Sequence, residues 1–98
     1  MRIQFEAEIF RWSAREQDWY FVALPEEFSA DVKDVAHPPR GFGAVRVEAV
    51  IGSSRWRTSI FPDKQRGAYV LPLKRAVRDA EGVEGAGTVT VELEVLGV

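Results

Sequence analysis

The basic side chains between residues 55 and 78 are the groups in this 98-residue chain whose types and spacing could do chemistry. This segment holds seven basic residues and a single acid, Asp63, and so carries a charge of +6. The rest of the chain holds six basic and fourteen acidic residues, which makes its charge −8 and the total −2. Guanidinium groups bind phosphate and carboxylate oxygens through paired hydrogen bonds, so the segment predicts a site for a small anionic ligand or an acidic partner surface.

Seven residues of this basic segment form the expected binding site. They are Arg57, Ser59, Phe61, Lys64, Lys74, Arg75 and Arg78. The first three would share one strand face, Lys64 would lie in a loop with Arg66, and the last three would lie on a helix surface. If the strand and helix ends converge, these residues form a cationic groove with aromatic walls from Phe61 and Tyr69. The alternative is a set of solvated surface charges that the acidic part of the chain neutralises, which is the commoner meaning of a charge run.

No set of residues for acid–base, nucleophilic or metal chemistry emerges from the sequence. His37 is the single histidine, and the absence of cysteine excludes disulfides, thiolate metal sites and thiol catalysis. The turn Gly41-Phe42-Gly43 follows an expected helix and precedes a strand, whereas a dinucleotide-binding glycine turn has the opposite order. Glu6 and Glu8 fall on the strand face opposite the apolar residues, so we expect them to be solvated. We therefore expect no catalytic residue, no metal ligand and no cofactor.

Alternation of apolar and polar residues predicts the strands that must position these groups. Residues 3–10 alternate strictly, and residues 19–24 are apolar on both faces, which is typical of a central strand. These two runs should pair as a hairpin around a polar turn at 13–18. The remaining strands are expected at 45–51, 55–61, 68–71 and 88–96.

Two short helices are expected, each opened by a proline that follows a leucine. Pro25 and Pro72 suit a first helical turn because the missing N–H group of proline costs nothing there. Gly82 is the expected glycine at the end of the second helix. The expected apolar stripe of that helix consists of Leu73, Ala76, Val77 and Ala80.

The three tryptophans are expected in the core. Trp19 and Trp56 fit apolar strand positions, while Trp12 stands at a strand end beside a polar turn and could be half-exposed. Burial is the default for all three because tryptophan is usually buried with its N–H group satisfied.

The order of landmarks in the first half of the chain recurs in the second half. The matching pairs are Ile9-Phe10 with Ile60-Phe61, Leu24-Pro25 with Leu71-Pro72, and Gly41–Gly52 with Gly85–Gly97. This recurrence predicts a duplicated ββαβ unit, with copies at about 1–52 and 53–98. We expect one mainly-β domain over residues 1–98, whose six strands and two short helices close as a small barrel without exposed edges. Because both copies lie in one chain, a monomer is expected.

Four motifs, in this order, resemble those of one family. They are Trp19-x-Phe21-Val22-x-Leu24-Pro25, Arg40-Gly41-Phe42-Gly43-x-Val45-x-Val47, Trp56-x-x-Ser59-Ile60-Phe61-Pro62 and Leu71-Pro72-Leu73-Lys74-x-x-Val77-Arg78. They cover nearly the whole chain, which resembles the bacterial family numbered nineteen-oh-five among the domains of unknown function. The resemblance implies a six-stranded double-split β-barrel, the architecture of swapped-hairpin bacterial transcription regulators. It implies no reaction, because the family has no assigned activity.

The leading functional prediction is a non-enzymatic binding module for a small anionic ligand or an acidic partner surface. The alternatives are a DNA-binding regulator, by analogy with the regulators that share the barrel, and an uncharacterised enzyme. The net charge of −2 makes nucleic acid an unfavourable partner. No apolar run approaches the roughly 20 residues that cross a bilayer, and the N-terminus lacks the pattern of a signal peptide. We therefore expect a cytoplasmic protein with no membrane attachment.

Overall fold

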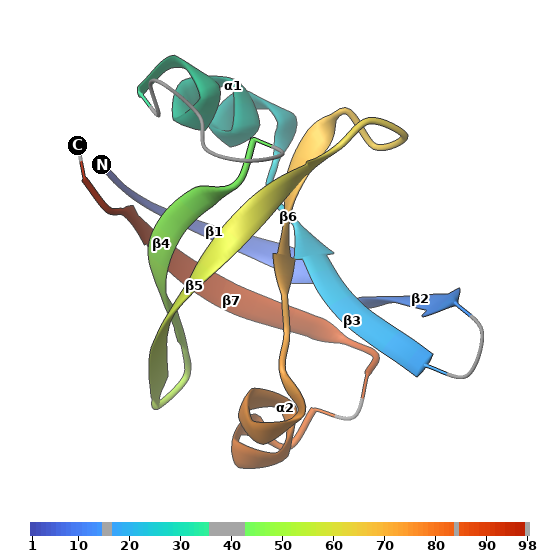
Figure 1. The fold of residues 1–98 in the computed structure, drawn as a ribbon. Helices are drawn as coiled ribbons and strands as arrows, with labels where there is room; N and C mark the ends of the chain where they lie inside the picture. Colours follow the sequence, from blue (N-terminus) through green and yellow to red (C-terminus); the bar gives the residue numbers. More distant parts are fainter. Residues whose placement is uncertain (15–16, 36–42, 84, 98) are drawn as a thin grey trace.

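The alternating segments of the chain form a mainly-β structure, an antiparallel sheet that curls into a half-barrel (Figure 1). The computed structural model describes residues 1–14, 17–35, 43–83 and 85–97. The elements are β1 (Arg2–Glu8), β2 (Phe10–Ala14), β3 (Gln17–Ala23), α1 (Glu26–Val35), β4 (Val45–Ile51), β5 (Ser54–Asp63), β6 (Ala68–Pro72), α2 (Arg75–Glu81) and β7 (Thr88–Val95). None of these helices is long and apolar enough to cross a membrane.

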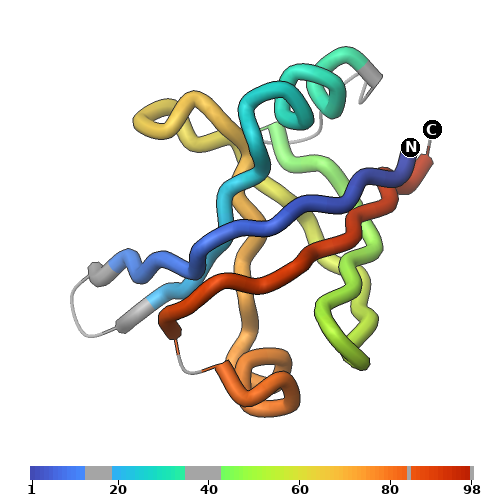
Figure 2. The backbone as a smooth tube through the Cα atoms, turned by 180° about the vertical axis from the view of Figure 1, so that it is seen from behind, coloured from blue at the N-terminus to red at the C-terminus, as the bar shows by residue number. Residues whose placement is uncertain are grey.

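The strand order places the two strands nearest the N-terminus at opposite edges of the sheet. The order is β1-β7-β4-β5-β6-β3-β2, and each neighbouring pair is antiparallel. β1 runs beside β7 along its whole length, and the chain then continues into β2, which pairs with β3 (Figure 2). The helices α1 and α2 lie at opposite ends of the curled sheet (Figure 1).

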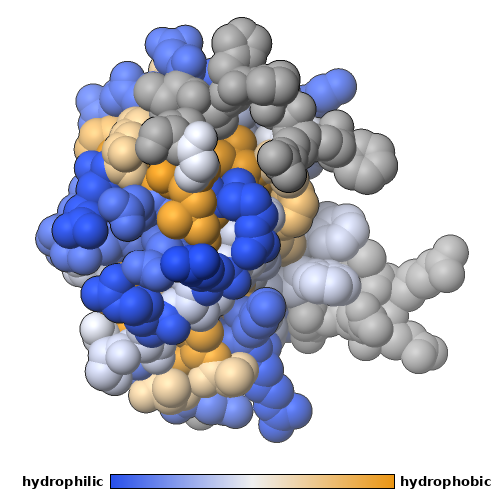
Figure 3. Space-filling view, turned by 60° about the vertical axis from the view of Figure 1, so that its left-hand side comes forward, coloured by the Kyte–Doolittle hydropathy of each residue, from blue (hydrophilic) through white to orange (hydrophobic). Residues whose placement is uncertain are grey.

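The core lies inside the curl and is built from the alternate residues of the strands. Val47, Val91 and Leu93 are almost fully buried there, and Val32 attaches α1 to the same cluster. The polar alternate residues point outward, and hydrophilic side chains, with hydrophobic patches between them, lie on the face seen in Figure 3. This arrangement is what period-two alternation produces when one face of a sheet is covered.

The predicted first strand is two strands, so the sheet has seven strands rather than six. The strand expected at 3–10 is interrupted at Ile9, where the chain leaves β7 and joins β3. The N–H group of Ile9 donates to the carbonyl of Gly87 at 2.8 Å, and its side chain is buried. Ile9 continues the alternation of Ile3 and Phe5, so the sequence pattern does not show that the strand stops pairing with β7 and begins pairing with β3.

The hairpin β2–β3 is longer than predicted. Residues 13–14 and 17–18, which were expected in a polar turn, pair with one another in the two strands. Backbone pairing continues past the apolar residues because main-chain hydrogen bonds do not depend on side-chain polarity. Trp12 and Trp19 lie directly opposite each other in this hairpin, on the face opposite that of the buried Val22.

The second helix begins later than predicted. Pro72 is the last residue of β6 and pairs with Phe21, and the helix begins at Arg75 after the N-cap residue Lys74. Leu73 is buried ahead of the helix, and its N–H group donates to the carbonyl of Tyr20 at 2.8 Å. The rest of the predicted stripe is not buried, because α2 packs at the end of the sheet rather than on its face.

Polar contacts hold α2 in place, since none of its residues is buried. The carboxylate of Glu81 accepts hydrogen bonds from the Ser53 N–H group (3.3 Å), the Ser53 hydroxyl (3.3 Å) and the Ser54 hydroxyl (2.5 Å). These bonds tie the helix to the turn between β4 and β5. The helix ends at Gly82 as predicted, with a left-handed backbone (φ 68°) that suits glycine.

Candidate functional site

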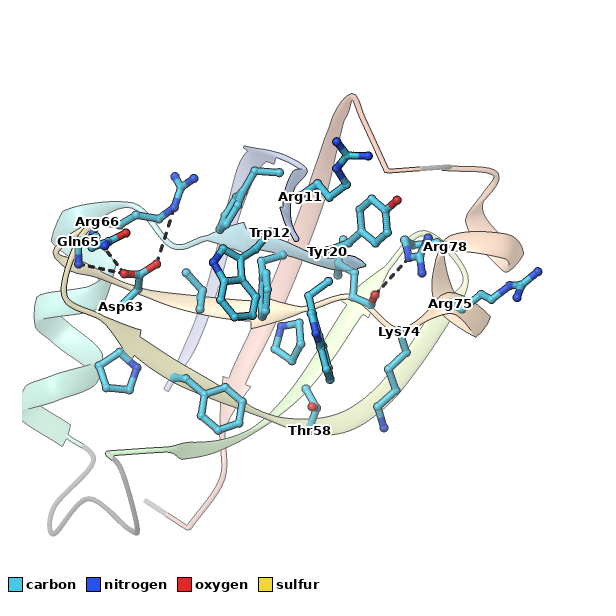
Figure 4. A pocket seen from close by; sticks show the side chains of 18 of the residues that line it. Arg11, Trp12, Tyr20, Thr58, Asp63, Gln65, Arg66, Lys74, Arg75 and Arg78 are labelled. Carbon is cyan, nitrogen blue, oxygen red and sulfur yellow. Dashed lines mark hydrogen bonds and ion pairs between the residues drawn. The ribbon is translucent and has the colours of Figure 1, made fainter. Parts of the chain in front are cut away.

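A groove of about 1110 Å³ lies between the β2–β3 hairpin, the turn that joins β5 to β6, and α2. Figure 4 shows the groove from close by, with Trp12 in the middle. Arg66 lies toward one end, and Lys74, Arg75 and Arg78 lie toward the other. The groove therefore has an aromatic middle between two cationic ends.

One face of the β2–β3 hairpin forms the aromatic wall. Phe10 pairs with Phe21 in the strand register, and Trp12 pairs with Trp19. Residues two apart on a strand share a face with their cross-strand partners, so the four rings lie together. The rings of Phe10 and Phe21 stack with centroids 5.7 Å apart. The indoles remain 56% exposed at Trp12 and 46% exposed at Trp19.

Phe61 and Pro62 also line the groove, and they lie on β5 rather than on the β2–β3 hairpin. Phe61 is 40% exposed. Among the described residues, the large apolar side chains that remain exposed are Trp12, Trp19 and Phe61, and all three line this groove. Exposed apolar surface gathered at one place usually marks a binding site, whereas scattered single residues do not.

Of the cations at the α2 end, Arg78 lies over the ring of Tyr20. The guanidinium of Arg78 lies 4.0 Å from the centroid of that ring, and its Nε donates to the carbonyl of Leu73 at 3.3 Å. Arg75 pairs with Asp79 at 3.7 Å, but both side chains are largely exposed. Lys74 has no ion-pair partner among the described residues. The position of Arg78 is therefore fixed, while the Lys74 ammonium group is available to a ligand.

Asp63 organises the opposite end of the groove. Its carboxylate accepts hydrogen bonds from the N–H groups of Gln65 (3.0 Å) and Arg66 (3.4 Å), which shapes the turn. The Arg66 guanidinium lies 3.5 Å from the centroid of Phe10 and 3.9 Å from the Asp63 carboxylate. Lys64 lines the same end. Arg66 therefore already interacts with the ring of Phe10, through a cation–π contact, and with the carboxylate of Asp63.

Five of the seven residues expected to bind a ligand line this groove: Phe61, Lys64, Lys74, Arg75 and Arg78. Arg57 and Ser59 do not line it. Arg57 lies 3.7 Å from Glu48 in an ion pair, and Ser59 is opposite Arg46 in the β4–β5 register. The expected shared face fails because β5 changes partner, pairing with β4 through Ile60 and with β6 from Phe61 onward.

Tyr69 is not a wall of this groove, contrary to the expectation. It is buried, it lines a second hollow of about 810 Å³ beside α1, and its N–H group donates to the Ser29 hydroxyl at 3.0 Å. Burial raises the pKa of the Tyr69 hydroxyl. The side chain of Tyr69 faces away from the groove because it alternates with Val70, which lines the groove.

Sequence reasoning missed the aromatic wall because it placed the tryptophans in the core. That prediction is wrong for Trp19, Trp12 is half-exposed as its place beside a turn allowed, and Trp56 is partly buried against the core. The available signal was the pair of motifs Phe10-x-Trp12 and Trp19-x-Phe21 on either side of a turn. In a hairpin, such spacing brings four rings to one face.

Away from the groove, Glu48 and the arginines opposite it on β5 interact with one another. Glu48 accepts a hydrogen bond from Arg55 at 2.7 Å, which lowers the pKa of its carboxyl group, and Arg57 acts in the same direction. Within the described residues, no group of three or more His, Cys, Asp or Glu side chains could hold a metal ion. Residues 36–42, which include His37 and the predicted turn at Gly41, lie outside the described part of the chain.

The comparisons with known proteins identify a family and assign no activity. A comparison with curated proteins found no match. The model of a family described as a domain of unknown function, DUF1905, matches residues 5–93. The matched span contains all the residues that line the groove. The chain belongs to the DUF1905 family.

Proposed function

We propose that the protein is a non-enzymatic binding module for a small organic anion that carries an apolar body, and that the groove beside α2 is its site. One observation supports this most. The exposed large apolar side chains of the described residues line the same groove as six basic residues and one acidic residue. A ligand with only charge would leave the exposed rings uncovered, and a ligand with only apolar surface would make no ion pair with Lys74.

The two kinds of contact are expected to contribute differently. Covering about 100 Å² of ring surface would contribute about 2.5 kcal/mol. Exposed cations such as Lys74 and Arg75 contribute less individually, because water and salt screen them. Ring contact would therefore supply most of the affinity, and the charges would select an anion and orient it.

An anionic naphthalene dye, 8-anilinonaphthalene-1-sulfonate, tests the proposal directly. It should bind with a dissociation constant that the double variant Lys74→Glu/Arg75→Glu raises about tenfold or more. The matched control is Arg46→Glu/Arg57→Glu, which makes the same change of charge on residues that do not line the groove. Dye fluorescence measures both constants. Equal effects of the two double variants would refute the groove as the site.

We also propose that the half-barrel is a double-split barrel built from a duplicated ββαβ unit and that the protein is a monomer. The strand order supports this proposal. If β1 and β2 are counted as one strand, exchanging that strand with β5, β3 with β6 and β4 with β7 gives the same strand order again. The strand changes partner at Ile9-Phe10 in one half and at Ile60-Phe61 in the other, at the residues that match in sequence.

Two hydrogen bonds between β3 and β6 are related in the same way. The N–H group of Leu24 donates to the carbonyl of Tyr69 (2.9 Å), and the N–H group of Leu73 donates to the carbonyl of Tyr20 (2.8 Å). A pseudo-twofold axis would therefore relate Leu24 to Leu73. The sequence match instead pairs Leu24 with Leu71, which lies two residues earlier in the chain.

Light scattering over a range of protein concentrations tests the monomer. A mass that doubles with concentration would contradict it.

A further inference from the structure

We propose that the ligand of the groove is a nucleoside phosphate, with its base stacked on the indoles of Trp12 and Trp19 and its phosphate at Lys74 and Arg75. This inference rests on the proposed function and specifies the ligand class for the same groove. Three features of the site support it. They are the shape of the apolar surface, the distribution of charge between the two ends, and the basic residues at the start of α2, which oppose the helix dipole.

The apolar surface of the groove is made mainly of flat rings. Six aromatic residues line it, against two aliphatic residues, Val70 and Leu73, and two prolines. About half of each indole of the Trp12–Trp19 pair is open to solvent. Ring faces favour a flat partner with a π-face that stacks on them. An acyl chain would be better served by an enclosed aliphatic channel.

The charge of the groove is concentrated at the α2 end. Lys74, Arg75 and Arg78 line that end without a lining acid, whereas Lys64 and Arg66 share the other end with Asp63. Arg66 is also occupied by the ring of Phe10. Several cations beside a planar platform suit a dianion such as phosphate better than a single carboxylate.

The cations at the start of α2 do not suit the helix dipole. α1 begins with Glu26 and Glu27, which suit the positive end of the helix dipole. α2 has no acid in its first turn, its N-cap is Lys74 without a side-chain cap bond, and its first residue is Arg75. Basic residues at this end oppose the dipole, so their placement points to binding.

The test compares four small probes on the full chain by isothermal titration calorimetry: adenosine 5′-monophosphate, adenosine, ribose 5-phosphate and decanoate. The nucleotide should bind about tenfold or more tightly than each of the other three, because only it offers both the base and the phosphate. Trp19→Ala should weaken the nucleotide about tenfold and leave ribose 5-phosphate unchanged. Trp19→Phe should recover part of the loss, which separates the lost ring from any loss of fold.

The outcomes that overturn the inference are distinct from those that overturn the proposed function. If decanoate binds as tightly as the nucleotide, and the Lys74→Glu/Arg75→Glu variant weakens it, the groove binds anions but not through a base. If none of the three anions binds, both proposals fail. If a single-stranded hexanucleotide binds more than about tenfold tighter than the mononucleotide, the ligand is a nucleic acid strand and the inference is wrong.

Discussion

At the scale of single residues, Glu81 ties one helix to a distant turn. Its carboxylate joins α2 to the β4–β5 turn, and through α2 it positions the cations of the groove. The space beside Gly52 is filled by this carboxylate, so that a side chain at residue 52 would overlap it. One acid therefore links the stability of the turn to the geometry of the site.

The contribution of Glu81 should depend on pH. The hydrogen bond from the Ser54 hydroxyl, together with those from Ser53, lowers the pKa of Glu81 below its ordinary value of 4.5. A lowered pKa in the fold means that the charged carboxylate stabilises the protein above pH 4.5, and that this stability is lost as the pH falls through the folded pKa. Glu81→Gln should lower the urea midpoint at pH 7, and its difference from the wild type should shrink below pH 4.5. Glu6→Gln, an exposed residue with no such bonds, is the control and should leave the midpoint at pH 7 unchanged.

Replacing Gly52 should cost more than replacing Gly67. Both glycines have a left-handed backbone (φ 57° and 66°), so alanine costs about 1–2 kcal/mol at each position. At Gly67 nothing lies near the added methyl group, whereas at Gly52 the methyl group displaces Glu81 from its serine partners. Urea unfolding should show the larger loss for Gly52→Ala. In a Glu81→Ala background the two losses should become equal, and a persistent difference would contradict the role of the carboxylate.

At the scale of elements, α2 is a short helix whose sequence contributes little to its own stability. It buries no side chain and begins with basic residues. The buried anchor is Leu73, just ahead of the helix, and the cations Lys74, Arg75 and Arg78 follow on the side of the groove. The helix therefore serves as a platform for charge, and its stability comes from contacts at its two ends.

Changing the N-cap of α2 should separate stability from binding. Lys74 has the extended backbone of an N-cap (φ −66°, ψ 153°) but makes no capping bond. Lys74→Asp should raise the free energy of unfolding by about 1 kcal/mol, because its carboxylate can accept from the free N–H groups of the first turn. The same variant should weaken the binding of adenosine 5′-monophosphate. Lys74→Ser, which caps without negative charge, should be similarly stabilised and less impaired in binding. A loss of stability in both variants would show that Lys74 has a structural role.

At the scale of the whole molecule, a curled sheet lets two distant parts of an acidic chain form one basic groove. The groove carries six basic residues and one acid, a net +5, on a protein of net charge −2. The β2–β3 hairpin brings the rings, and the segment from β5 to α2 brings the charges. The two changes of strand partner, at Ile9 and after Ile60, bring these segments together.

Salt should weaken the binding of charged ligands and spare neutral ones. The Debye length falls from about 10 Å at 0.1 M salt to about 3 Å at 1 M, so the field of the groove is screened. Raising sodium chloride from 50 to 500 mM should weaken adenosine 5′-monophosphate binding several-fold and leave adenosine nearly unchanged. Calorimetry at both concentrations measures this. An equal effect on both ligands would mean that charge does not contribute to recognition.

Local sequence patterns predicted most of the secondary structure and the cationic half of the site. Alternation identified the strands, the family motifs identified the chain as a mainly-β member of DUF1905, and the surplus of basic residues pointed to the segment around Lys74. These features depend on a residue and its near neighbours. They are legible in the sequence because side-chain direction repeats with a short period in strands and helices.

Only the tertiary structure decided which of these residues meet. A strand that changes partner keeps its alternation, so nothing local shows that the strand at 3–10 divides at Ile9 or that Phe61 leaves the face of Arg57 and Ser59. The exposure of Trp12 and Trp19 likewise follows from which face of the hairpin the core covers, since the buried Val22 lies on the opposite face. Pairing between distant segments determines these features, and such pairing is a property of the whole sheet rather than of any one segment.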